Sequence, residues 1–190
     1  MKSKNGVKIG IVVLVLLLAI GFAAVTTQLF INGTINIGPD NNDFNTNVTF
    51  YSATATGAAQ QGVTGDVAAS ASLSNDKKTI TFTTQILDTI GEESLLEYDV
   101  DNQSTYDALL GDMVCSLGNT FDAENASLTL NTEYVRITSN NELKNTVVAS
   151  GTHTSTKGSV LVKQIKSYNG TTATNLQFTC RMNADAQEAA

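Results

Sequence analysis

Two cysteines and one histidine are the side chains with the widest chemical range in this chain of 190 residues. Cys115 and Cys180 each fall on the apolar side of an alternating stretch, so we expect both to point inward from strands. A nucleophilic thiolate needs an electropositive, partly exposed setting, which such positions do not offer. Outside the reducing cytoplasm an even pair can form a disulfide, and we favour this over two buried thiols acting as small apolar side chains.

The only histidine, His153, lies in "SGTHTST" and has no partner with which to hold a metal. One histidine cannot make the HExxH helix of a zinc protease, so we expect a surface strand residue. Asp40, Asn42 and Asp43 in "PDNNDFN" are oxygen ligands that suit calcium, but the stretch lacks the glycine and the distal glutamate of an EF-hand loop. Such turns more often bond their own backbone. We therefore predict no metal and no cofactor.

Motifs of catalysis are missing from the sequence. It contains no G-x-S-x-G, Walker loop or dinucleotide fingerprint, and its carboxylates are scattered over outward strand positions. The formal net charge is −7, and the part after residue 25 is more acidic still, because Lys2, Lys4 and Lys8 lie ahead of it. An acidic surface repels nucleic acid. We predict a protein that is not an enzyme and binds no nucleic acid.

The sequence predicts that the elements that position these residues are short strands. In "KTITFTT" Ile80 and Phe82 alternate with threonines, and "LLEYDVDN" alternates apolar and acidic residues without an error. Further stretches of the same kind reach the C-terminus, where Leu176, Phe178, Cys180 and Met182 share one face. The pattern predicts an all-β fold, an antiparallel β-sandwich that is jelly-roll-like or Ig-like.

The N-terminus has the layout of an export signal: a basic "MKSKNGVK" followed by an uncharged apolar run, residues 9–25. Gly21, Ala23 and Ala24 mark the region where a signal peptidase would cut. The run is slightly short for a spanning helix, so we favour a signal peptide, with an uncleaved membrane anchor as the alternative. A pilin-like leader cut after Gly6 ranks last. Each reading places the remaining chain outside the cytoplasmic membrane.

We therefore divide the chain into residues 1–25, a signal peptide or anchor, and residues 26–190, a single β-sandwich domain. The domain would begin with a strand over residues 28–37. An alanine- and glycine-rich stretch after "TNVTFYS" has too little bulk for a core, which indicates a loop, an edge strand or both.

The basic leader, the apolar run that ends in small residues and the following "INGTINIG" resemble the N-terminus of the TasA/camelysin-like exported proteins of Gram-positive bacteria. Residues 78–110 are similar as well. Members of that family pair a turn and a strand with an "NNGT.DA"-like turn, and "ILDTIGEESLLEYDVDNQSTYDA" stands in those places.

The resemblance implies a jelly-roll-like sandwich, exported with the help of a dedicated signal peptidase, that polymerises into extracellular fibres of a biofilm matrix. In such fibres the N-terminal strand of one subunit fills a gap in the sheet of the next. The donor residues would be Leu29, Ile31, Ile35 and Ile37. On pattern alone we favour pairing of this strand within its own domain, because most terminal strands of this kind close their own sheet.

The function predicted is thus an exported structural protein of the cell surface or matrix, a self-associating fibre subunit that works by donor-strand exchange. The alternative is a membrane-anchored sandwich, held by residues 9–25, whose loops bind a carbohydrate or a protein. A metal-dependent hydrolase ranks third.

Overall fold

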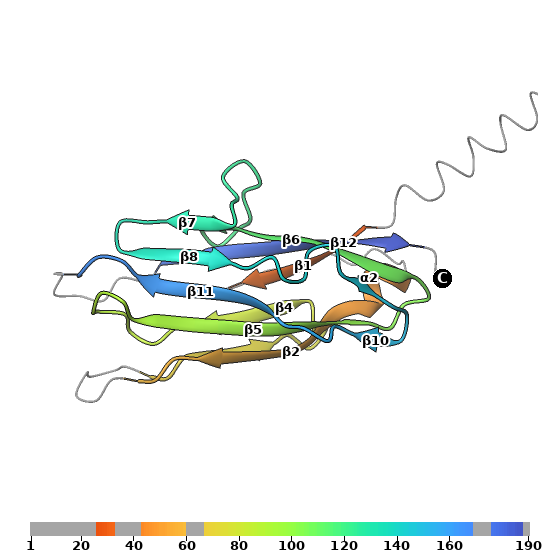
Figure 1. The fold of residues 1–190 in the computed structure, drawn as a ribbon, viewed down its shortest axis with the longest axis horizontal. Coiled ribbons are helices and arrows are strands. Elements are labelled where there is room, and N and C mark those ends of the chain that lie inside the picture. Colours follow the sequence, from red (N-terminus) through yellow and green to blue (C-terminus); the bar gives the residue numbers. More distant parts are fainter. Residues whose placement is uncertain (1–25, 33–42, 60–66, 169–175, 188–190) are drawn as a thin grey trace, which may run out of the picture.

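The computed structural model describes residues 26–32, 43–59, 67–168 and 176–187. These ranges form two sheets that face each other, which confirms the prediction of an all-β, mainly antiparallel sandwich (Figure 1). The leader over residues 1–25 lies outside the described residues. The elements are β1 (Thr26–Asn32), α2 (Asp43–Asn47), β2 (Val48–Thr56), β3 (Ser70–Leu73), β4 (Thr79–Thr83), β5 (Glu93–Asn102), β6 (Asp107–Leu117), β7 (Thr129–Asn131), β8 (Val135–Ser139), β9 (Val147–Val148), β10 (Thr152–His153), β11 (Gly158–Gln164) and β12 (Phe178–Gln187).

The first sheet, sheet A, has the strand order β3-β4-β1-β12-β6-β9. All of its pairs are antiparallel except β1 with β4, which is parallel. A bulge between Met182 and Ala184 of β12 shifts the register against β6. The last described strand, β12, thus lies near the middle of the sheet, beside β1, the first described strand.

The second sheet, sheet B, is built around β5. One side of β5 pairs with β11 and, further along, with β10, while β2 pairs with the other side. The sheet continues from β11 through β8 to β7. The alternation that we saw in "LLEYDVDN" is confirmed, because Leu96, Tyr98 and Val100 are buried on β5 while the acidic residues between them are partly exposed.

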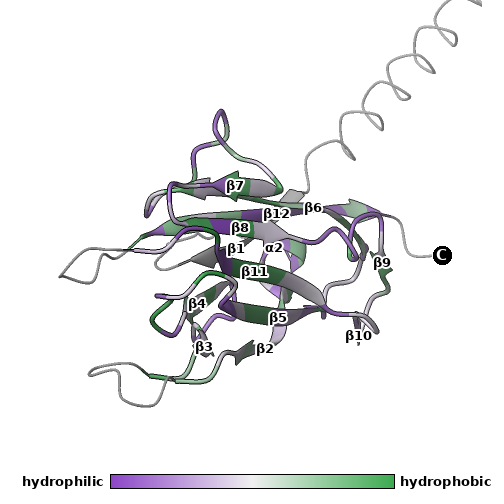
Figure 2. Cartoon of the chain, turned by 60° about the vertical axis from the view of Figure 1, so that its left-hand side comes forward, coloured by the Kyte–Doolittle hydropathy of each residue, from purple (hydrophilic) through white to green (hydrophobic). Residues whose placement is uncertain are grey.

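The core fills the space between the sheets with alternate residues of both. Hydrophobic and hydrophilic colours accordingly change along β5, β11 and β12 in Figure 2. Phe50 and Tyr98 meet edge to face with ring centroids 5.5 Å apart. The Tyr98 ring lies over Gly158, its partner across the β5–β11 pair, and a Cβ atom at Gly158 would collide with it.

The turn between β5 and β6 is organised by a fully buried asparagine. Asn102 is 0% exposed, and its side-chain NH₂ donates to the carbonyls of Tyr106 and Val148 at 2.7 and 2.8 Å. Its side-chain oxygen accepts from the backbone N–H and the hydroxyl of Ser104. Every polar atom of this side chain is therefore bonded, as a buried amide requires.

Three details differ from the sequence analysis. The first strand begins at Thr26 rather than residue 28, because its pairing with β12 already starts there, and residues 33–37 lie outside the described residues. The end of "GPDNNDFN", expected as loop, enters α2, whose Phe44 is buried. Leu176 precedes β12 and is 46% exposed, so it does not share the core with Cys180.

Candidate functional site

The first described strand, β1, occupies an interior position of sheet A (Figure 1). Its seven residues pair antiparallel with β12, from Thr26 opposite Asp185 to Asn32 opposite Thr179. On its other side Phe30 and Ile31 pair parallel with Thr79 and Ile80. We call the position between β4 and β12 the β1 slot.

Two of the four expected donor residues, Leu29 and Ile31, lie in the described part of β1 and have register partners on the neighbouring strands. Leu29 lies opposite Met182, and Ile31 lies between Cys180 and Ile80. Met182, Cys180 and Ile80 are each 0% exposed, so both positions belong to rows whose other residues face the core. Ile35 and Ile37, like the cleavage residues Gly21, Ala23 and Ala24, lie outside the described residues.

Among the described strands of sheet A, β1 alone connects two groups of strands. Its removal would separate β3–β4 from β12–β6–β9, and it would leave two facing strand edges with unpaired backbone groups. The sequence pattern favours pairing of this strand within its own domain, and the structure has that arrangement. The chain's own first described strand therefore occupies the slot.

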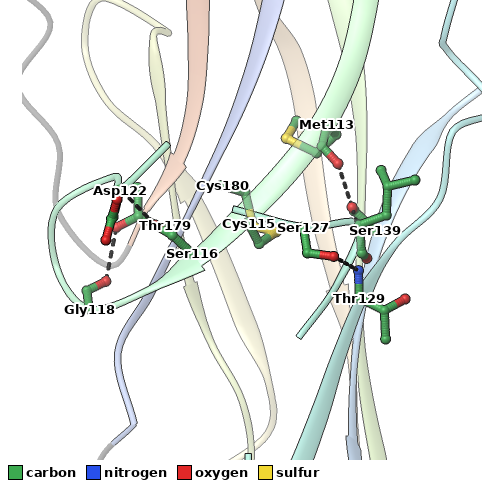
Figure 3. Close-up of a disulfide and its surroundings, with 11 residues drawn as sticks. Met113, Cys115, Ser116, Gly118, Asp122, Ser127, Thr129, Ser139, Thr179 and Cys180 are labelled. Carbon is green, nitrogen blue, oxygen red and sulfur yellow. Dashed lines mark hydrogen bonds between the residues drawn. A yellow bond between two sulfur atoms is a disulfide. The ribbon is translucent and has the colours of Figure 1, made fainter. Parts of the chain in front are cut away.

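Cys115 and Cys180 are joined in a disulfide next to the slot (Figure 3). They lie directly opposite each other on β6 and β12, and both are buried, as the alternation predicted. On the far side of β6, Cys115 exchanges two backbone hydrogen bonds with Ser127, each of 2.8 Å. The bond joins the β12 wall of the slot covalently to β6.

The loop after β6 folds back over the same strands. Thr179 donates its hydroxyl to the carbonyl of Gly118 at 3.0 Å, and Ser116 accepts from the backbone N–H of Asp122 at 2.9 Å (Figure 3). Arg181 places its guanidinium 5.4 Å from the ring centre of Phe121. These contacts fix the outer side of β12 to a loop that does not involve β1.

The other wall, β4, is attached to sheet B by a buried lysine that precedes it. Lys78 is 7% exposed, and its ammonium donates to the backbone carbonyl of Val48 at the start of β2. Burial lowers the pKa of Lys78 from 10.5 to about 8, while the nearby carboxylate of Asp76 opposes the shift. The backbone N–H of Phe50 donates to the carbonyl of Lys77 at 2.9 Å and adds a second tie between the same segments.

Lys78 is not among the residues predicted from the sequence, although its position in the alternation carries a signal. Lys78, Ile80 and Phe82 are alternate residues and share the inward face of this segment. A lysine in phase with buried residues of a strand indicates a buried ammonium that must find an acceptor.

The remaining candidates do not form a chemical centre. His153 is an exposed residue of β10, as predicted, and stacks on Tyr51 with ring centroids 4.4 Å apart. The carboxylate of Asp43 accepts from the backbone N–H and the hydroxyl of Thr105, at 2.8 and 3.0 Å, so it ties α2 to the β5–β6 turn. Those two bonds lower the pKa of Asp43. Asp40 and Asn42 lie outside the described residues.

The described part of the chain has no group of three or more His, Cys, Asp or Glu residues that could hold a metal ion. Nor does any helix in it have the length and hydrophobicity to cross a membrane.

Comparisons with protein-family models, with curated proteins and with solved structures each found no match to this chain. What the fold and the site define is a structural class: a disulfide-bonded β-sandwich whose first described strand sits inside a sheet.

Proposed function

We propose that this chain is an exported structural subunit of the cell surface or extracellular matrix, and that subunits join into fibres by donor-strand exchange. In this process β1 of one copy leaves its own slot and fills the β1 slot of the next. The observation that carries the proposal is the interior position of β1 at the beginning of the described fold.

Exchange of β1 conserves the bonds that hold it. An identical strand from another copy pairs with the same seven residues of β12 and the same two of β4, so no backbone partner is lost in the product. Strand addition of this kind takes its affinity from main-chain hydrogen bonds and its register from alternate side chains. Positions 29 and 31 would supply that register.

The donor strand and the slot of one subunit are different surfaces. A contact between unlike surfaces is heterologous and, where the rotation between copies does not close a ring, it grows into an open filament. Residues 33–42 separate β1 from α2, and ten extended residues reach up to about 35 Å. The slot of an adjacent copy must therefore lie within this reach for β1 to enter it.

Export is the other half of the proposal. A disulfide is compatible with an oxidising environment outside the cytoplasm. Cleavage by a signal peptidase in the region of Gly21, Ala23 and Ala24 would free β1, whereas an uncleaved segment over residues 9–25 would keep the chain on the membrane. The resemblance to TasA/camelysin-like proteins supports the same function and implies a jelly-roll order of strands.

The test is to lock β1 in its own slot. Gln28 and Asn183 are direct register partners on β1 and β12, so the double variant Gln28→Cys, Asn183→Cys can form an intrachain bond between donor strand and slot. We expect electron microscopy to show filaments of the wild-type protein recovered outside the cell, and only monomers of the oxidised double variant. Donor-strand exchange requires β1 to leave, and the lock prevents it.

The matched controls are Gln28→Cys and Asn183→Cys alone, each with its new thiol alkylated. Both should form filaments as the wild type does. Filaments of the locked double variant would show that assembly does not use β1. A wild-type protein that stays monomeric and keeps residues 9–25, as read by N-terminal sequencing, would favour the anchored binding module instead.

A further inference from the structure

We infer that the Cys115–Cys180 disulfide confines the opening of sheet A to β1, so that the slot keeps its β12 wall when β1 leaves. The inference rests on the proposed function in one respect: a slot that persists has a use only if a second strand enters it.

The disulfide lies in the same cross-strand row as the centre of the slot. From one edge to the other this row contains Leu73, Ile80, Ile31, Cys180, Cys115 and Ser127. In the row, Cys180 of β12 has Ile31 of β1 as its register partner on one side, and on the other side a disulfide joins it to Cys115 of β6. The two sides of β12 therefore differ in how they can separate.

The backbone pairing around the disulfide shows why the covalent bond matters. Because Cys115 directs both its backbone bonds to Ser127, its pair with Cys180 is of the non-hydrogen-bonded type. The flanking pairs, Ser116 with Thr179 and Val114 with Arg181, are then the hydrogen-bonded ones between β6 and β12. The disulfide thus joins the two strands at a position where no backbone bond does.

The opposite wall is also held without β1. The ammonium of Lys78 and the backbone bond from Phe50 to Lys77 attach the start of β4 to β2 in sheet B. Each wall of the slot has its own tie to the rest of the sandwich, and neither tie passes through the strand that exchanges.

Without the disulfide, the first and last strands could leave together. They pair over seven residues, and β12 is the last strand of the described fold. Local opening occurs in contiguous cooperative units. We take the β1–β12 pair to be such a unit once the disulfide is absent, although β12 also pairs with nine residues of β6. Its departure would remove the wall along with the donor strand, so an incoming strand would find no slot.

Hydrogen exchange of single amides, measured by NMR on the full exported chain, tests the inference. The amides of Thr179 and Arg181 report whether β12 stays on β6, and that of Val160 on β11 reports opening of sheet B. In the oxidised protein we expect β1 amides to exchange at least ten-fold faster than Thr179 and Arg181. In Cys115→Ala, Cys180→Ala the exchange rate of Thr179 relative to Val160 should rise about ten-fold or more.

Two further samples serve as controls for the exchange rates of the double cysteine variant. Wild-type protein reduced with a phosphine provides the same comparison if the double variant does not fold. Val162→Ala truncates a core residue of β11 that is 4% exposed and leaves the disulfide intact, so it lowers the stability of the whole sandwich. In that control the rate of Thr179 relative to Val160 should not change.

The inference is overturned if Thr179 and Arg181 exchange as fast as β1 in the oxidised protein, or if loss of the disulfide leaves their rates relative to Val160 unchanged. Neither outcome depends on filaments. Conversely, filaments formed by the Gln28–Asn183 locked variant would refute donor-strand exchange. They would not change the hydrogen-exchange rates of the monomer, so the inference about the disulfide would still be decided by those rates.

Discussion

A buried ammonium is costly, because the charged form loses its hydration. In this protein Lys78, the residue before β4, accepts that cost and donates to the carbonyl of Val48. The loss of hydration lowers the pKa of Lys78 to about 8 in the folded protein, whereas its pKa in the unfolded chain is about 10.5. Between these values the unfolded state binds more protons, so the free energy of unfolding rises with pH.

Lys78→Met should remove this pH dependence. We expect the free energy of unfolding of the wild type, relative to the variant, to increase by about 2 kcal/mol between pH 7 and pH 10. Urea unfolding at both pH values measures the difference. The exposed neighbour Lys77→Met is the control and should not alter the slope; an unchanged slope in Lys78→Met would show that this ammonium is not desolvated.

Gly158 is needed for packing, because the ring of Tyr98 occupies the space that a side chain at this position would fill. Gly158→Ala forces the ring out of its place against Phe50, and overpacking of this kind costs about 2 kcal/mol. Thermal unfolding should show the loss. Ser159→Ala, the next residue along β11, should leave the melting temperature within about 2 °C.

At the scale of elements, the sequence predicted the features that depend on neighbouring residues, such as single strands and the faces of their side chains. Strict alternation identified β5 and β4, and it placed both cysteines inward. The position of β1 was beyond such a pattern, because it depends on pairing of residue 31 with residues 80 and 180, far along the chain. α2 was missed because one turn around Phe44 carries no helical period.

The disulfide is a covalent constraint between β6 and β12. It closes a loop with a sequence separation of 65 residues, which contains β7 to β11. In the chain-entropy model its loss costs about 4 kcal/mol, or about 10 °C in melting temperature for a domain of this size. Calorimetry of Cys115→Ala, Cys180→Ala against wild type measures this. A loss below about 1 kcal/mol would mean that the unfolded chain is already restricted.

At the scale of the whole molecule, net charge opposes self-association. The formal charge is −7, and its sign is the same on every copy, so approaching subunits repel. Salt screens this repulsion, with a Debye length that falls from about 14 Å at 50 mM to about 6 Å at 300 mM. Filament elongation should therefore become several-fold faster over this range, as light scattering can follow. Slower growth in salt would indicate that opposite charges on donor and acceptor guide assembly.

The buried amide of Asn102 also bears on how the protein is produced. Asn102, Gln103 and Ser104 read N-x-S, the acceptor sequence for glycans in the eukaryotic secretory pathway. There the sugar is attached before the chain has folded, and the fold has no room for it at a side chain that is 0% exposed and donates both amide hydrogens. Yeast or mammalian secretion should therefore yield misfolded material, whereas the exposed acceptor at Asn125 would tolerate the same modification.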